Sequence, residues 1–163
     1  MRLNNYVIFL IVYTVFASVI DFYTNCFIPK VWPKRTLAEK LQMIFYLVLH
    51  NILYYLIYFT LPFTIYNYKT ITMKHLVMYL ALLIAVPVHW KTNDNKCWFT
   101  VEQNRLLEID ERYGFRDPYL ILTNQHVCTG NGALRDKLYY NYLITALGIT
   151  LIMIMSKVTV YRL

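Results

Sequence analysis

Serine and glycine are scarce in this chain of 163 residues, which has four glycines and only two serines, Ser18 and Ser156. A nucleophile elbow, a phosphate-binding loop and a dinucleotide-binding fingerprint each need a serine or several glycines at fixed spacing. None of these patterns occurs here. The sequence therefore excludes the most common signatures of hydrolases, nucleoside triphosphatases and dehydrogenases.

Cysteine is also infrequent, and Cys26, Cys97 and Cys128 are the whole complement. Their number is odd, and no two of them have the Cys-x-x-Cys spacing. A disulfide framework is therefore not implied.

Charged residues make up 15% of the chain and hydrophobic residues 58%, against about 25% and about 45–50% in a typical globular protein. Seven of the nine acidic residues lie between Lys91 and Lys137, and the other two are Asp21 and Glu39. Long tracts are therefore free of charge. The tract at 41–68 alone exceeds the roughly 20 residues that a helix needs to cross a bilayer core.

These tracts predict an all-α integral membrane protein that forms a single membrane domain over residues 1–163. We expect four transmembrane helices at about residues 3–23, 41–66, 76–90 and 138–156, with a polar interfacial loop at 91–137. The apolar run near the N-terminus also fits a signal peptide. Its length favours a retained first span with Asp21 near the membrane edge.

Two local patterns refine the second and third spans. Thr36 followed by Glu39 is typical of a capping box, which predicts that the second helix begins near Leu37. Pro87 lies near the end of the third span, where it is expected to kink or end the helix.

A second capping-box pattern, Thr100 with Gln103, predicts a helix at 101–112 with Gly114 as its C-terminal cap. Apolar residues recur on one face of this segment. We therefore expect an interfacial amphipathic helix between the third and fourth transmembrane helices, lying along the membrane surface.

The net charge of +7 raises the question of nucleic acid. Lysine and arginine lie in the connections between apolar runs, where they face anionic lipid headgroups, so the predicted partner is the lipid bilayer and not nucleic acid. Eleven of the 16 basic residues fall on the side of the two longer connections. The positive-inside tendency predicts that this side faces the cytosol.

His50 is the candidate cofactor ligand in the second span. Tyr46, His50, Tyr54 and Tyr58 recur every four residues and so share one helix face. An imidazole in hydrocarbon is costly and should face the helix bundle. A haem, quinone or proton site is one interpretation; a hydrogen-bonded packing stripe is favoured, because no charged residue lies in this span to complete a relay.

The junction at 89–100 contains candidate metal ligands. His89, Cys97, His126 and Cys128 provide the two histidines and two cysteines that a closed zinc site often uses. Their spacing departs from the usual ligand pairs. A disulfide between Cys97 and Cys128 is a second interpretation, and a structural cap that needs no cofactor is the favoured one.

Tryptophan supports the structural interpretation. Trp90 and Trp98 both lie within the junction, and Trp32 lies beside lysines in the first connection. Tryptophan concentrates at the boundary between lipid and water. We therefore expect Trp32, Trp90 and Trp98 to be interface anchors.

The junction reads His89-Trp90-Lys91-Thr92-Asn93-Asp94-Asn95-Lys96-Cys97-Trp98-Phe99-Thr100. The pattern His-Trp-x-x-Asn-x-Asn-x-Cys-x-Phe-Thr resembles small uncharacterised multi-pass membrane proteins, some encoded by large DNA viruses. In those proteins leucine is more frequent at the position of Phe99. The resemblance implies a compact four-span protein in a membrane beneath a capsid, and it implies no activity.

The functional expectation is a non-catalytic structural or assembly component of a larger membrane complex, in a viral internal membrane and associated with other membrane or capsid proteins. We expect the protein to form a homo- or hetero-oligomer and to hold no resident cofactor. One alternative is an accessory subunit of an organellar respiratory complex. Another is a zinc- or haem-dependent membrane redox protein that uses His50 or the His89/Cys97/His126/Cys128 group.

Overall fold

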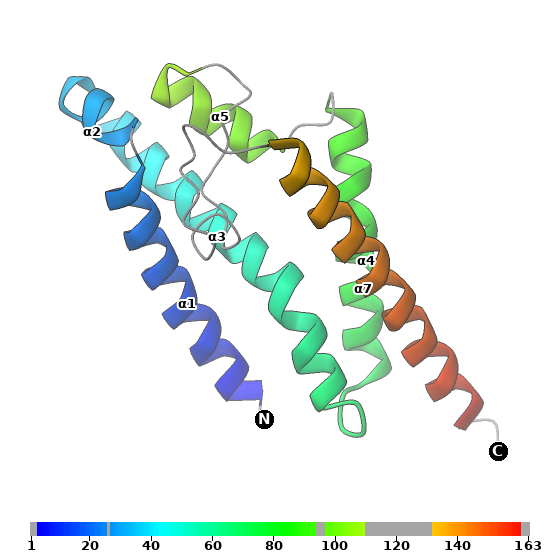
Figure 1. Ribbon diagram of the computed structural model, residues 1–163. Helices are drawn as coiled ribbons and strands as arrows, with labels where there is room; N and C mark the ends of the chain where they lie inside the picture. Colours follow the sequence, from blue (N-terminus) through cyan, green and yellow to red (C-terminus); the bar gives the residue numbers. More distant parts are fainter. Residues whose placement is uncertain (1–2, 26, 94–96, 110–131, 161–163) are drawn as a thin grey trace.

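The computed structural model describes residues 3–25, 27–93, 97–109 and 132–160, and the regular structure in these residues is helical (Figure 1). Four helices are long and apolar enough to cross a membrane. They are α1 (Leu3–Thr24), α3 (Leu37–Tyr66), α4 (Met73–Thr92) and α7 (Gly132–Val160). The prediction of an all-α chain with four apolar helices is confirmed.

The four long helices alternate in direction (Figure 1). Both chain ends lie at one end of the molecule, together with the turn at 67–72 between α3 and α4. The short helices α2 (Ile28–Val31), η1 (Trp32–Lys34) and α5 (Trp98–Leu107) lie at the opposite end, which we call the α5 end. The two longer connections therefore share one end, as the four-span prediction requires.

Helix α3 begins where the sequence predicts. The Thr36 hydroxyl accepts a hydrogen bond from the Glu39 backbone N–H at 3.3 Å, and the Glu39 carboxylate accepts one from the Thr36 backbone N–H at 2.9 Å. This is a complete capping box. Helix α4 differs from expectation, because it continues through Pro87 to Thr92.

Helix α3 is the centre of the packing, with α1 on one side and the α4–α7 pair on the other. A core of buried residues joins α3, α4 and α7. Its members are Ile57, Leu61, Tyr79, Leu83, Val86, Tyr139, Leu143 and Ala146. A smaller core at the α5 end joins α2, α3 and α5 and consists of Ile28, Val31, Met43, Leu106 and Leu107.

Most of the apolar surface of the long helices faces outward. Only 22% of the most apolar window of α1 is buried, and 33% of that of α3. On α1 the exposed apolar side chains are Val7, Ile8, Phe9, Ile11, Val12, Val15, Phe16, Val19 and Tyr23. Buried positions on the same helix include Thr14, Ser18 and Asp21. The helix thus turns polar groups inward and apolar groups outward.

The predicted bounds of the amphipathic helix are wrong. Helix α5 begins at Trp98 and ends at Leu107, and its N-cap is Cys97, which makes no side-chain cap hydrogen bond. The predicted capping box therefore does not form, and Gln103 is instead buried against α3 with 1% of its surface exposed. Gly114, the predicted C-terminal cap, lies outside the described residues.

Candidate functional site

Several groups of polar and aromatic side chains lie between the helices, and the first group surrounds Pro62. Pro62 lies inside α3 and has no backbone N–H, so the Tyr58 carbonyl four residues earlier loses its helical donor. The Tyr142 hydroxyl donates to this carbonyl at 2.8 Å and lies 3.1 Å from the Ile57 carbonyl. The Tyr79 hydroxyl also donates to the Ile57 carbonyl, at 2.8 Å. Tyrosines from α7 and α4 thus supply donors at the proline gap of α3.

No local sequence pattern singles out Tyr79 or Tyr142. Pro62 was the available signal, because a proline inside a long helix predicts an orphan carbonyl at the residue four before it. Which donor reaches that carbonyl depends on how α7 packs on α3. In an apolar surrounding such a donor is needed, since an unsatisfied carbonyl there costs several kcal/mol.

Three residues of the predicted stripe on α3, His50, Tyr54 and Tyr58, pack with Tyr139 and Trp90 in an aromatic column, whereas the fourth, Tyr46, packs against Trp98. The His50 ring stacks on Tyr54 with centroids 4.6 Å apart, and Tyr54 stacks on Tyr58 at 5.9 Å. Tyr139 of α7 contacts Tyr54, Tyr58 and Trp90 at 6.1, 5.6 and 4.8 Å. The expectation that His50 faces the bundle is confirmed, and its side chain is buried.

A polar seam, which we define as Tyr6, Ser18, Asn51, Tyr55 and Thr60, connects α1 to α3. The Asn51 amide donates to the Ser18 hydroxyl at 3.3 Å and to the Leu47 carbonyl at 3.0 Å. Nearer the chain ends, the Tyr55 hydroxyl donates to the Tyr6 carbonyl at 3.0 Å, and the Tyr6 and Thr60 hydroxyls share a hydrogen bond. Such bonds join membrane helices where apolar packing cannot distinguish a neighbour from lipid.

Asp21 is also buried, with 1% of its surface exposed, in the last turn of α1. The sequence predicts this carboxylate near a membrane edge. Its place at the α5 end of α1 agrees with an edge position, but the side chain is turned into the protein.

The junction between α4 and α5 is held by His89. The Nε2 atom of His89 accepts a hydrogen bond from the Trp98 backbone N–H at 3.2 Å. This N–H is one of the donors that the first turn of a helix leaves unpaired. His89, a candidate metal ligand by its sequence, thus caps α5 from the last turn of α4.

The proposed zinc ligands are brought together only in part. His89 bonds to the backbone N–H of Trp98, the residue after Cys97, and Cys97 is a half-buried free thiol. His126 and Cys128 lie outside the described residues. Within the ranges that the structure describes, no three His, Cys, Asp or Glu side chains are grouped as metal ligands.

The three tryptophans all lie at the α5 end. Trp32 packs edge-on against Phe22 at 4.9 Å, and Trp98 packs edge-on against Tyr46 at 5.7 Å. Trp90 lies in the last turns of α4 and contacts Tyr139. Their common level is what a belt of interface anchors requires. Their contact with lipid headgroups remains a prediction.

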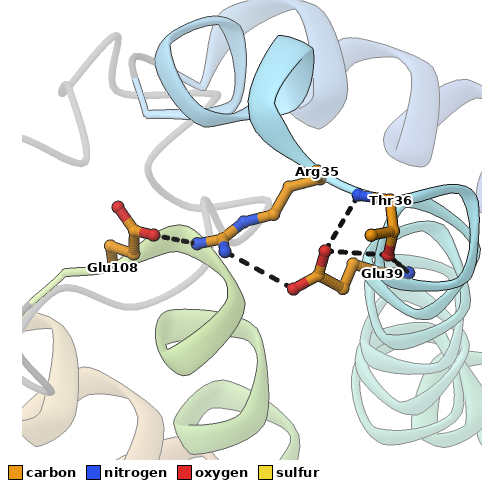
Figure 2. A network of polar contacts seen from close by, with 4 residues as sticks. All are labelled: Arg35, Thr36, Glu39 and Glu108. Carbon is orange, nitrogen blue, oxygen red and sulfur yellow. Dashed lines mark hydrogen bonds and ion pairs between the residues drawn. The ribbon is translucent and has the colours of Figure 1, made fainter.

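A network of charged groups joins the start of α3 to the end of α5 (Figure 2). The Arg35 guanidinium lies 2.7 Å from the Glu108 carboxylate and 3.5 Å from that of Glu39. Glu108 has φ 55°, in the left-handed region, and follows the last residue of α5. The backbone N–H of Ile109 then bonds to the Asn104 carbonyl at 3.2 Å, which closes the helix.

The underside of α5 contains two buried side-chain amides. Gln103 and Asn104 are each 1% exposed. In the described part of the chain, neither the nitrogen nor the oxygen of the Gln103 side-chain amide has a hydrogen-bond partner. The Asn104 side-chain amide nitrogen also has none. Helix α5 is therefore held down by its apolar residues and by contacts at its two ends, and not by these amides.

The chain matches no protein-family model, no curated protein and no solved structure.

Proposed function

We propose that the chain is a non-catalytic multi-pass membrane protein that serves as a structural or assembly component of a larger membrane complex. The observation that carries this proposal is the distribution of polarity across the long helices. Polar side chains such as Ser18 and Asn51 are paired between α1 and α3, whereas the outward faces are apolar. Lipid or another membrane protein would cover such faces.

The interior supports a structural role over a transport role. The aromatic column and the tyrosines at the proline gap fill the space between α3, α4 and α7 with ring contacts and hydrogen bonds to backbone. Transporters keep ionisable groups along a pathway at mid-membrane. The charged groups described here lie near helix ends, with Asp21 and Lys157 as the buried examples.

The resemblance of the junction motif makes a viral internal membrane beneath a capsid the first assembly to examine. An organellar respiratory complex is the second. A redox role for His50 is the alternative of a different class, and an absorbing cofactor in purified protein would favour it.

The experiment has two stages. Alkaline carbonate extraction and vesicle flotation test whether the chain is an integral membrane protein. Native gel electrophoresis after mild detergent extraction then tests whether it migrates in one complex of fixed stoichiometry. Release into the soluble fraction by carbonate would overturn the membrane assignment. A monomer that carries stoichiometric haem or zinc would overturn the structural role.

Zinc is tested separately with Cys97→Ala. We expect the variant to assemble like the parent chain, and elemental analysis of the parent to give substoichiometric zinc. Loss of assembly together with loss of bound zinc would instead establish a structural metal site at the junction.

A further inference from the structure

The connection between α1 and α3 has an excess of positive charge. Lys30, Lys34, Arg35 and Lys40 lie within 27–40, and Glu39 is the one carboxylate in that segment. The segment is at the α5 end, where the long apolar helices stop. In a bilayer this is the level of the phospholipid headgroups.

The neighbouring carboxylates are already engaged by Arg35. Glu39 and Glu108 both lie within ion-pair distance of its guanidinium, as Figure 2 shows. Among the described residues, no carboxylate lies within ion-pair distance of Lys30, Lys34 or Lys40. The three ammonium groups therefore have no counter-charge from the described part of the chain.

The backbone that presents these lysines is fixed. Ile28 and Val31 are buried in the core at the α5 end, and the Trp32 ring packs edge-on against Phe22. The Lys40 ammonium lies 5.6 Å from the centroid of the Trp32 ring, within the range of a cation–π contact. Lys30 and Lys34 flank Trp32 in sequence and are exposed. Positive charge thus surrounds an amphipathic ring that favours the interface.

We infer that this turn is a binding surface for anionic phospholipid headgroups, with Lys30, Lys34 and Lys40 contacting the phosphate groups and Trp32 seated among the headgroups. The inference rests on the proposed membrane location and deepens it, because it names the lipid class that the protein selects. Charge complementarity favours anionic over zwitterionic lipid at this surface.

The test uses Trp32 as the reporter in full-length protein with Trp90→Phe and Trp98→Phe, reconstituted in phosphatidylcholine vesicles. Brominated phosphatidylglycerol or brominated phosphatidylcholine is added at equal mole fraction, and quenching of Trp32 fluorescence is measured. We expect the anionic lipid to quench roughly twofold more strongly at low salt. This difference should shrink in about 0.5 M NaCl, where exposed charges are screened.

Charge variants locate the effect. Lys30→Gln/Lys34→Gln/Lys40→Gln should abolish the preference, and replacement of the same three lysines by arginine should retain it. Lys69→Gln/Lys74→Gln removes exposed lysines from the opposite end of the molecule and should change nothing. Should the triple glutamine variant misfold, Lys30→Gln/Lys34→Gln leaves the Lys40–Trp32 contact in place and should at least halve the preference.

Equal quenching by the two lipids, or a preference that survives the loss of the lysines, would overturn the inference and leave the membrane location intact. Absence of quenching by either lipid, together with failure to float with vesicles, would overturn both. The two failures are therefore distinguishable.

Discussion

Arg35 and Glu108 form an ion pair with an N–O distance of 2.7 Å, and it joins the residue before the N-cap of α3 to the residue after α5. The Arg35 side chain is largely buried, whereas that of Glu108 is 64% exposed. The pair lies at the C-terminal end of α5, and His89 caps the N-terminal end. Helix α5 is thus attached at both ends by side chains from elsewhere in the chain.

The variant Glu108→Gln should loosen α5 slightly. Because Glu108 is well exposed, loss of the pair should cost about 0.5 kcal/mol. Amide hydrogen exchange should be faster in α5 by up to a few-fold and unchanged in α1. Glu102→Gln is the matched control, since it removes an ion pair internal to α5. Equal effects of the two variants would show that the Arg35 contact does not hold the helix.

Glu108→Gly separates backbone strain from charge. Both Glu108→Gly and Glu108→Gln lack the ion pair, but glycine adopts a φ of 55° without the cost of roughly 1 kcal/mol that other residues incur. The glycine variant should therefore be the more stable of the two by about 1 kcal/mol. Chemical unfolding in mixed micelles measures the difference. A glycine variant no more stable than the glutamine variant would argue against a left-handed residue at 108.

Gln103→Met should stabilise the docking of α5. The side-chain amide of Gln103 is buried without a hydrogen-bond partner among the described residues, and such a group costs about 1–3 kcal/mol. A methionine of similar length removes the polar atoms. We expect slower hydrogen exchange in α5. Faster exchange would mean that the amide has a partner in solution that the described residues do not supply.

Tyr142→Phe should cost about 1 kcal/mol, because the Tyr58 carbonyl then loses its donor. In a Pro62→Ala background the new backbone N–H at residue 62 can serve that carbonyl, so the cost of Tyr142→Phe should fall by at least half. The double-mutant cycle is read from unfolding free energies in mixed micelles. Tyr140→Phe, at an exposed position on the same helix, should show no such dependence. A cost of Tyr142→Phe that is the same in both backgrounds would disprove the link to Pro62.

The contact between Asn51 and Ser18 should contribute a measurable coupling energy. The cycle of Asn51→Leu with Ser18→Ala is expected to give about 0.6 kcal/mol, the average for hydrogen bonds between membrane helices. Ser156, the other serine of the chain, is exposed on α7 and provides the control. If the coupling energy between Asn51 and Ser156 were as large as that between Asn51 and Ser18, the energy measured would not come from the contact between α1 and α3.

Local signals in the sequence were sufficient for the long helices. The apolar tracts predicted four of them, and the start of α3 followed from Thr36 and Glu39, which lie three residues apart and bond to each other. The inward-facing stripe that includes His50 followed from helical spacing alone. Each of these features depends on residues within one or a few turns.

Contacts between distant segments could not be predicted in this way. Helix α5 begins at Trp98 because His89, in the preceding helix, caps its first turn, and that depends on α4 continuing through Pro87. It ends at Leu107, and the side chain of the next residue, Glu108, pairs with Arg35, which is distant in sequence. The donors for the Tyr58 carbonyl depend likewise on the packing of α7, which no local pattern specifies.

Helix α1 packs mainly on α3, and this has a consequence for insertion of the chain during its synthesis. Helix α1 leaves the ribosome before α3, which is its main partner among the long helices. Until α3 follows, Ser18 lacks the Asn51 amide that bonds to it in the finished fold. For a membrane-inserted chain, we expect the insertion machinery to retain α1 until α3 arrives and to release the two as a hairpin. The seam that stabilises the finished fold would thereby also set the order of its biogenesis.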